Sequence, residues 1–424
     1  MLFSFIHISD IHLGRPFSDL SKYSYDDKTA AIYKNAVERT FNNIIDYAIV
    51  KNVDFVLIAG DTFDSSEHDF NSKLILKEGL KKLDDADIKV FMICGNHDPV
   101  YSYNKNTFNY SPDSNIKIIG VNTDPVCTLP VFNKSNEQIA LIHALSFTED
   151  KFEENPAKYF KRADDAGLFN IGLLHCDLNA DKSSPYAPCN ISDLKSLGYD
   201  YFALGHIHIP SLEENTIQYA GTIQGRNTKE TGAHGIKYIK VDNGKIIKNN
   251  FIPLDIIRFE DVSIDLSSAK NSLSAFDIII EEINLITNKE KNSCELFLIT
   301  LNLEGYIGFY DELTDEFYNT ICEKLKTDFN VYISQIINST ITIVDNKLLL
   351  EDDGISGELY KTLQDDSILN NSFSDIEKQL NNLIIQCNLN ENDYNKFKED
   401  IIKNAKEKCI NLCSKVYNFE NKEE

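Results

Sequence analysis

The chain has 424 residues, 42% of them hydrophobic and 25% charged, which is typical of a soluble globular protein large enough for two or three domains. No apolar run approaches the roughly 18 to 20 residues that cross a bilayer, and the N-terminus lacks a secretory signal, which argues against a membrane or secreted protein. The nine cysteines form no CxxC pair, so a reducing cytoplasm is expected, and most of the net charge of −24 lies after residue 250.

Strand and helix signals alternate over the first 120 residues. The pattern predicts strands over 2–9, 53–59 and 88–94 and helices over 26–51 and 71–85. Gly60 and Gly95 end the second and third strands. This order is typical of a mostly parallel sheet covered by helices.

Shorter strands follow up to residue 252. Apolar segments predict strands over 116–120, 126–132, 138–143, 169–175, 201–204, 217–219, 235–241 and 246–252, with helices near 150–163 and 192–197. Two sheets that face each other, with helices outside them, would bury these strands. We therefore expect a four-layer α/β/β/α sandwich.

The pattern changes beyond Pro253. Strands are predicted over 262–266, 295–303 and 330–335, and helices over 275–286 and 310–328. From about Gly354 the chain is polar and helical, with amphipathic stretches over 376–388 and 394–417. We expect three segments: the sandwich over 1–255, a smaller α+β domain over 256–350, and a helical region over 351–424 that packs on the body or on a partner.

Five short motifs stand at the ends of predicted strands. They are Asp10-Ile11-His12, Gly60-Asp61-Thr62-Phe63-Asp64, Gly95-Asn96-His97-Asp98, His175 and Gly205-His206-Ile207-His208. Residues two apart in a strand share a face, and ligands gather at the carboxyl ends of parallel strands. Carboxylate, imidazole and amide oxygen together suit Mn²⁺, Fe²⁺ or Zn²⁺. The motifs therefore predict a site for two metal ions.

Each motif alone has a simpler interpretation. Asp10 and His12 by themselves would more often be a polar cap, and His175 could be a hydrogen-bonded core histidine; the five motifs in this order favour ligands. Among the other histidines, His7 is expected to be structural and His143 to lie in the core or to support the site. His68 and His234 lie in polar segments, where solvent exposure is expected.

The D-x-H, GDxxD, GNHD, H and GHxH series resembles the calcineurin-like metallophosphoesterase superfamily. Within it, the chain resembles bacterial DNA-repair exonucleases of the YhaO type, which are related to the SbcD nuclease subunit. The resemblance runs from about residue 1 to residue 260. Beyond the motifs it includes the segments Phe169–His175, Pro185–Cys189, Asp200–His208 and Gln224–Arg226.

The resemblance implies a role for each motif residue. One ion would be held by Asp10, His12, Asp61 and His208, and the other by Asp61, Asn96, His175 and His206, so that Asp61 bridges them. His97 would lie beside the scissile phosphate as general acid or transition-state stabiliser, oriented by Asp98. Asp64 is a candidate supporting residue. Arg15 and Arg226 are candidate phosphate contacts, and a surface ion pair is as good an interpretation of either.

The resemblance also implies an activity, two-metal hydrolysis of DNA phosphodiesters with Mn²⁺, as a 3′→5′ exonuclease with single-strand endonuclease activity in DNA repair. It implies an SMC-like coiled-coil ATPase as partner, bound through the C-terminal region, and a possible homodimer. Such a partner would supply the basic surface that this acidic chain lacks.

Two other functions stay open. A cyclic-nucleotide or small phosphomonoester hydrolase could use the same ligands, because one fold hosts many substrates. A scaffold with an inactive site is disfavoured because all seven ligand positions are filled.

Overall fold

The computed structural model of the chain describes residues 1–14, 27–103, 108, 110–111, 113–120, 125–161, 167–179, 184–211, 216–290, 294–342, 346–365, 367–369 and 391–420. Contacts divide the chain into two compact units, Met1–Glu260 with Glu290–Leu298, and Asp261–Lys289 with Ile299–Glu424. These units interleave along the chain, so the three consecutive segments expected from the sequence stay a prediction.

The first unit contains a six-stranded sheet in the order β11-β10-β1-β2-β3-β4. Strands β1 to β4 run parallel, whereas β10 is antiparallel to both β1 and β11. All five residues of β2 are buried and apolar, as expected of a central strand covered on both faces. The strands are β1 (Leu2–Ile8), β2 (Phe55–Ala59), β3 (Lys89–Ile93), β4 (Ile116–Ile119), β10 (Gly235–Asp242) and β11 (Lys245–Pro253).

A second sheet of five strands packs against the first. Its order is β5-β6-β7-β8-β9, parallel except for β5. Phe5 of the first sheet stacks on Phe55 with ring centroids 4.8 Å apart and meets the ring of Tyr201 edge-on at 5.4 Å, within one apolar core shared by both sheets. The strands are β5 (Cys127–Phe132), β6 (Gln138–Leu145), β7 (Phe169–His175), β8 (Tyr201–Gly205) and β9 (Ile217–Tyr219).

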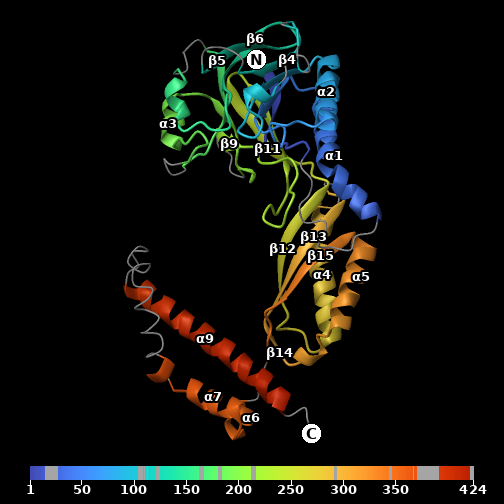
Figure 1. Cartoon of the computed structure of the whole chain (residues 1–424), viewed down its shortest axis with the longest axis vertical. Helices are drawn as coiled ribbons and strands as arrows, with labels where there is room; N and C mark the ends of the chain where they lie inside the picture. Colours follow the sequence, from blue (N-terminus) through green and yellow to red (C-terminus); the bar gives the residue numbers. More distant parts are fainter. Residues whose placement is uncertain are drawn as a thin grey trace. The chain divides into compact units, whose positions relative to one another are not determined.

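Helices cover the outer faces of the two sheets. Helices α1 (Asp27–Lys51) and α2 (Phe70–Asp85) lie on one side of the paired sheets, and α3 (Ile191–Ser196) lies on the other side (Figure 1). Helix α2 begins where the Asp69 carboxylate accepts from the backbone N–H of Ser72. The expected four-layer α/β/β/α sandwich is confirmed.

The helix expected near 150–163 is wrong over the described residues 150–161. The structure has only a short 3₁₀ turn there, η3 (Pro156–Tyr159). Asn155 precedes a proline, which disfavours the α-helical conformation at that residue. Phe152 instead bridges to Tyr186, so this segment is tied to a distant loop rather than wound into a helix.

The second unit contains a small sheet and several helices. A three-stranded sheet, β12 (Ile257–Asp265), β13 (Leu296–Glu304) and β15 (Val331–Asn338), alternates along the chain with helices α4 (Ser272–Glu290) and α5 (Asp315–Phe329). The remaining strands β14 (Tyr306–Ile307) and β16 (Ile341–Thr342) form a parallel pair.

Further helices follow in the same unit. They are α6 (Asn346–Glu351), α7 (Ile355–Leu363) and α9 (Glu391–Glu420), which pack around Leu349, Tyr360, Leu363 and Cys413. The amphipathic stretch expected over 376–388 lies outside the described residues, and the stretch over 394–417 falls within α9. Among the helices that the structure describes, none combines the length and apolarity needed to cross a membrane.

Candidate metal centre

Four of the expected ligands lie in a left-handed backbone conformation just beyond strand ends. The φ angles are 50° at Asp10, 50° at His12, 48° at Asp61 and 107° at His206. Strand alternation was expected to aim Asp10 and His12 together, but β1 ends at Ile8, and the left-handed turns aim them instead. Each residue held in such a conformation costs on the order of 1–3 kcal/mol, and such residues cluster at functional sites.

Glycines let the chain approach itself closely, within the first sheet at Gly95 and between the two sheets at Gly60 and Gly205. A Cβ on Gly95 would lie 2.1 Å from Oδ1 of Asp61, and a Cβ on Gly205 would lie 2.0 Å from the carbonyl oxygen of Ala59. Gly60 has a φ of +87°, and a Cβ there would lie 2.6 Å from Nδ1 of His175. At Gly95 and Gly205 the requirement is space rather than a special backbone angle.

The first group of donor atoms comes from Asp10, His12 and His208, which lie within 4.8 Å of one another. Nε2 of His12 lies 3.2 Å from Nε2 of His208 and 3.9 Å from Oδ2 of Asp61. Nε2 of His208 lies 4.0 Å from Oδ1 of Asp10. This is the set expected around one ion.

The second group forms around Asp61 and His175. Nε2 of His175 lies 3.4 Å from Oδ2 of Asp61 and 3.0 Å from Oδ1 of Asn96. The His206 ring centroid lies 5.3 Å from that of His175, and its backbone N–H donates to the Asp10 carboxylate at 3.1 Å. The structure thus brings together seven residues, which we call the metal cluster: Asp10, His12, Asp61, Asn96, His175, His206 and His208.

The charges of the metal cluster suit cations. Burial would raise the pKa of Asp61, but the charge of His175 and the hydrogen bond with it outweigh burial and lower that pKa. Burial would lower the pKa of His175, yet Asp61 outweighs it and raises the pKa to about 9. When no metal ion is bound, His175 is therefore protonated, and its positive charge lies beside the Asp61 carboxylate. Burial lowers the pKa of His206 to about 4, which keeps that imidazole neutral and able to ligate.

The ring contacts of His12 and His208 indicate that these residues fit a metal ion. Nδ1 of His208 lies 2.7 Å from the Glu230 carboxylate, which only accepts, so the ring proton sits on Nδ1 and the Nε2 lone pair is exposed. Nδ1 of His12 lies 3.2 Å from Oδ1 of Asp64, although this contact is poorly aligned for a hydrogen bond. When His12 carries its proton on Nδ1, facing Asp64, its Nε2 lone pair meets that of His208 at 3.2 Å, and one cation can accept both lone pairs. The donor set therefore fits divalent ions.

His97 lies beside the metal cluster. Its backbone N–H donates to Oδ1 of Asp61 at 2.9 Å, and its ring centroid lies 5.0 Å from that of His12. Nδ1 donates to the carbonyl oxygen of Asp64 at 2.8 Å, so Nε2 is the nitrogen left for a substrate. Donor atoms of His12, Asp64 and His97 also lie within 4.8 Å of one another.

The expected contact between Asp98 and His97 is wrong. The buried Asp98 carboxylate accepts hydrogen bonds from the backbone N–H groups of Thr62, Phe63 and Gly95 and from the Tyr103 hydroxyl at 2.6 Å. It therefore ties the loop after β2 to the loop after β3. Burial and the nearby Asp61 charge raise the pKa of Asp98 to about 7, against the lowering effect of these hydrogen bonds.

Comparison with known proteins identifies the family. Residues 3–210 match the model of the calcineurin-like phosphoesterases. A protein of Bacillus subtilis (strain 168), the uncharacterized metallophosphoesterase YhaO, is 32% identical over 309 residues, which cover 71% of this chain and 72% of that protein. The chain belongs to the calcineurin-like phosphoesterase family. Such enzymes typically hold two divalent ions, and this phosphoesterase has a candidate site for them.

Two solved structures are similar over parts of this phosphoesterase. One is TT1561 of Thermus thermophilus, with 9% identity and a TM-score of 0.32, covering 59% of this chain and 99% of that one. The other is a dimetal phosphatase from Danio rerio, with 12% identity and a TM-score of 0.33, covering 56% and 92%. TM-scores at this level carry no argument about substrate.

Arg226 and Glu230 of the phosphoesterase form a buried pair behind His208. The Arg226 backbone N–H donates to Oε2 of Glu230 at 2.8 Å, and Nη2 donates to Oε1 at 3.2 Å. The alternative of a surface ion pair for Arg226 is wrong, because its side chain is only 4% exposed. Arg15 lies outside the described residues. Sequence reasoning missed Glu230, although it stands four residues after the quoted Gln224–Arg226 segment.

Two other histidines differ from expectation. His68 and His234 are buried, not solvated. The His68 ring stacks on Phe63 with centroids 3.8 Å apart, and the His234 ring bonds the carbonyl oxygens of Thr222 and Glu230. Solvent exposure was expected because both histidines lie in polar segments of the sequence. His7, by contrast, lies between the sheets and bonds the Tyr201 hydroxyl, as a structural residue would.

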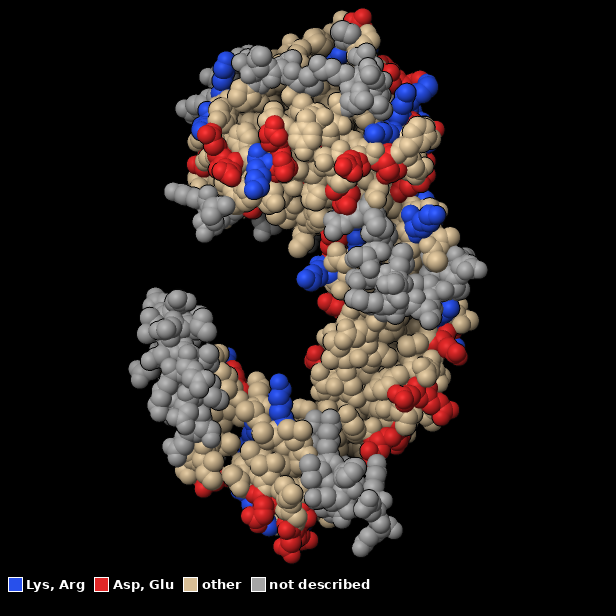
Figure 2. All heavy atoms as spheres, viewed as in Figure 1, with Lys and Arg blue, Asp and Glu red and all other residues tan. Residues whose placement is uncertain are grey.

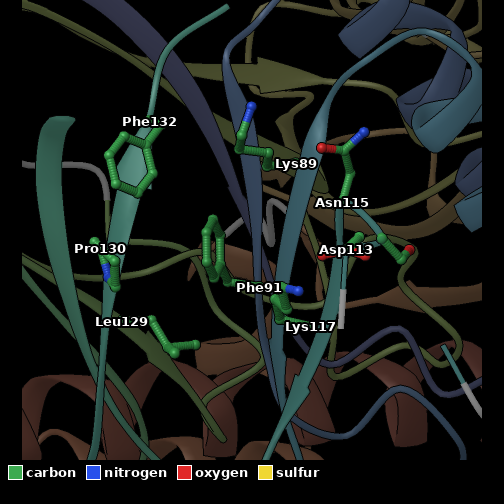
Figure 3. Close-up of a pocket in the computed structure, with 9 residues that line it drawn as sticks. Lys89, Phe91, Asp113, Asn115, Lys117, Leu129, Pro130 and Phe132 are labelled. Carbon is green, nitrogen blue, oxygen red and sulfur yellow. The ribbon is translucent and has the colours of Figure 1, made fainter. Parts of the chain in front are cut away.

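A cavity of about 290 Å³ lies apart from the metal cluster (Figure 3). Lys89, which starts β3, lines it, whereas Asn96 follows the opposite end of that strand. None of its lining residues belongs to the metal cluster, so it takes no part in the chemistry below. They are Lys89, Phe91, Asp113, Ser114, Asn115, Lys117, Leu129, Pro130 and Phe132.

Acidic and basic side chains are interspersed on the face of the molecule drawn in Figure 2. Over the described residues of that face, they form no continuous basic stripe of the kind that tracks a nucleic-acid backbone. This agrees with the acidic composition of the chain.

Proposed function

We propose that this metallophosphoesterase hydrolyses DNA phosphodiester bonds with Mn²⁺, as a 3′→5′ exonuclease with single-strand endonuclease activity in DNA repair. The observation that carries the hydrolytic part is the metal cluster, in which Asp10 belongs to both groups of donor atoms. Oδ2 of Asp61 lies 3.4 Å from His175 and 3.9 Å from His12, and His97 lies beside these residues. The DNA substrate is supported by the resemblance of the motif-bearing half to DNA-repair exonucleases.

The chemistry follows from the positions of the chain's own residues. When bound, two divalent ions polarise the phosphoryl oxygen and lower the pKa of a water molecule. Asp61 is buried and low in pKa, so it stays ionised, and its carboxylate would help to hold both ions because it faces His175 and His12. Nδ1 of His97 is held by the Asp64 carbonyl, which leaves Nε2 to donate a proton to the departing sugar oxygen. General acids in such positions contribute about 10²–10⁴-fold to the rate.

The second unit favours a polymer as substrate. It adds a β12-β13-β15 sheet with helices α4 and α5, and helices α6, α7 and α9, none of which supplies a residue of the metal cluster. Binding a small phosphate ester requires no such addition. We therefore favour a nucleic acid over a cyclic nucleotide.

The proposal includes a partner. The net charge of −24 opposes tight binding to a polyanion by this chain alone. An SMC-like coiled-coil ATPase, bound through the C-terminal helices, would supply the basic surface, and a homodimer of the phosphoesterase would suit such an assembly.

A substrate panel tests the proposal. The purified chain with Mn²⁺ is assayed on 3′- and 5′-labelled single- and double-stranded DNA, on cyclic nucleotides and on p-nitrophenyl phosphate, with His97→Asn as the control for contaminating nucleases. We expect stepwise release of nucleotides from 3′ ends. Hydrolysis of cyclic nucleotides or the monoester without DNA cleavage, with or without an added ATPase, would refute the DNA substrate.

A further inference from the structure

The two ion positions differ in the groups that contact their histidines on the side away from the ion. At the Asp10–His12–His208 position, each imidazole has a carboxylate on its Nδ1 side, Asp64 at 3.2 Å from His12 and Glu230 at 2.7 Å from His208. At the other position, Nδ1 of His175 lies 2.9 Å from a backbone carbonyl oxygen, that of Ala59. Within the described residues, no carboxylate lies within ion-pair distance of the His206 ring.

Glu230 fixes both the tautomer and the direction of His208. Its carboxylate accepts the Nδ1 proton, which directs the Nε2 lone pair toward His12 and Asp10. A carboxylate behind a ligating histidine also makes that histidine a stronger base and ligand. Glu230 is 9% exposed, so its carboxylate is largely shielded from solvent, whereas the His208 side chain is 28% exposed.

Arg226 holds Glu230 in place and reaches toward the other carboxylate. Besides its bonds to Glu230, Nη1 of Arg226 lies 3.9 Å from Oδ1 of Asp64. Nη1 is buried and forms no hydrogen bond in the structure, so it points at Asp64 across a gap. Nη2 also lies 3.1 Å from Nδ1 of His208, but both atoms are donors, so Glu230 is the partner of each. Arg226 thus stands between the two carboxylates that back the histidines.

We propose that Arg226 and Glu230 are positioning residues that hold His208 and make the Asp10–His12–His208 position the tighter of the two metal positions. This inference rests on the metal site of the proposed function and not on its DNA substrate. The second ion is the exchangeable one, because its imidazoles lack carboxylate support.

Metal titration of the full-length chain tests the inference without substrate. The protein is stripped with a chelator and titrated with Mn²⁺ by calorimetry, and with Co²⁺ by visible absorption, which reports ligand geometry. For the wild type we expect two binding events of different affinity. In Glu230→Gln, the tight event weakens by about 10–100-fold, the range seen when such supporting contacts are removed, and its Co²⁺ spectrum changes. The weak event keeps its affinity.

A double variant separates positioning from folding. Glu230→Gln leaves the Arg226 charge buried and poorly compensated, which destabilises proteins, whereas replacing both partners by apolar residues often does not. We therefore test the double variant Arg226→Met/Glu230→Leu alongside Glu230→Gln. The matched control is Glu154→Gln, because Glu154 forms an exposed ion pair with Lys158. The control is expected to match the wild type, and the double variant to fold and still lose the tight event.

Three results would overturn the inference. These are wild-type affinity at both positions in the folded double variant, equal weakening of both events, or loss of metal binding that only follows a lower melting temperature of the metal-free protein. A wild type that binds two ions but leaves DNA intact would refute the proposed substrate and leave this inference standing.

Discussion

Replacing Gly95 by alanine would disturb the carboxylate between the two ion positions. The new Cβ would lie 2.1 Å from Oδ1 and 2.6 Å from the backbone nitrogen of Asp61. Real Cβ atoms essentially never approach closer than 3.0 Å, so Asp61 or the loop after β3 must move by about 0.9 Å. A misplacement of about 1 Å at a reacting centre costs about 10²-fold in rate. Overpacking of this kind also destabilises the fold by about 1–3 kcal/mol.

The assay is hydrolysis of bis(p-nitrophenyl) phosphate with Mn²⁺, which does not depend on the DNA substrate. We expect kcat/KM of Gly95→Ala to fall about 100-fold, with weaker binding of both ions, because Asp61 faces both. Gly308→Ala is the matched control, since a Cβ there meets nothing within 4 Å. A Gly95→Ala protein with wild-type metal content and turnover would refute the reasoning that this glycine is required for space beside Asp61.

Three further predictions follow from the site. His97→Asn should retain both ions by elemental analysis yet lose about 10²–10⁴-fold in kcat, and normal turnover with normal metal content would exclude His97 as the proton donor. Asp98→Asn places an amide opposite backbone donors and should lower the free energy of unfolding by about 1–3 kcal/mol in urea titrations, an expectation refuted by an unchanged midpoint. In the metal-free protein, the pKa of His175 is raised from 6.5 to about 9, so the stability from its contact with Asp61 is complete below 6.5 and lost as pH rises through 9. An ion must displace that proton, so calorimetry in buffers of different ionisation enthalpy should detect proton release on metal binding at pH 7–8, and no release would contradict the raised pKa.

Local signals predicted the strands and the positions of the metal cluster. Strand ends place Asp10, Asp61 and Asn96 at the carboxyl edge of the first sheet, and His175 at the carboxyl end of β7 in the second sheet. The left-handed turns at Asp10 and His12 were not predictable from alternation, because they depend on hydrogen bonds to Gly60 and Asp61 on the neighbouring loop. Asp10 and His12 lie together as predicted, but left-handed turns bring them together rather than strand alternation.

The contacts that hold the site residues in place could not be predicted from the sequence. Glu230 reaches His208 across 22 residues, and nothing in the local sequence pattern distinguishes this buried acid from the exposed ones. Asp98 stands next to His97 in the sequence, yet its carboxylate turns toward the backbone of the loop after β2. His234 is buried because strand and loop backbones close around it. Each of these contacts depends on segments that meet only in the folded chain.

The metal cluster draws on loops from both sheets, and this has a consequence for how the enzyme matures. Asp10, Asp61 and Asn96 leave the ribosome long before His206 and His208, because strands β5 to β9 of the second sheet are encoded after β1 to β4 and before β10 and β11 of the first sheet. A nascent chain that ends before β8 therefore presents an incomplete set of ligands for either ion. The complete set of ligands therefore forms only after both sheets have been synthesised and have packed together.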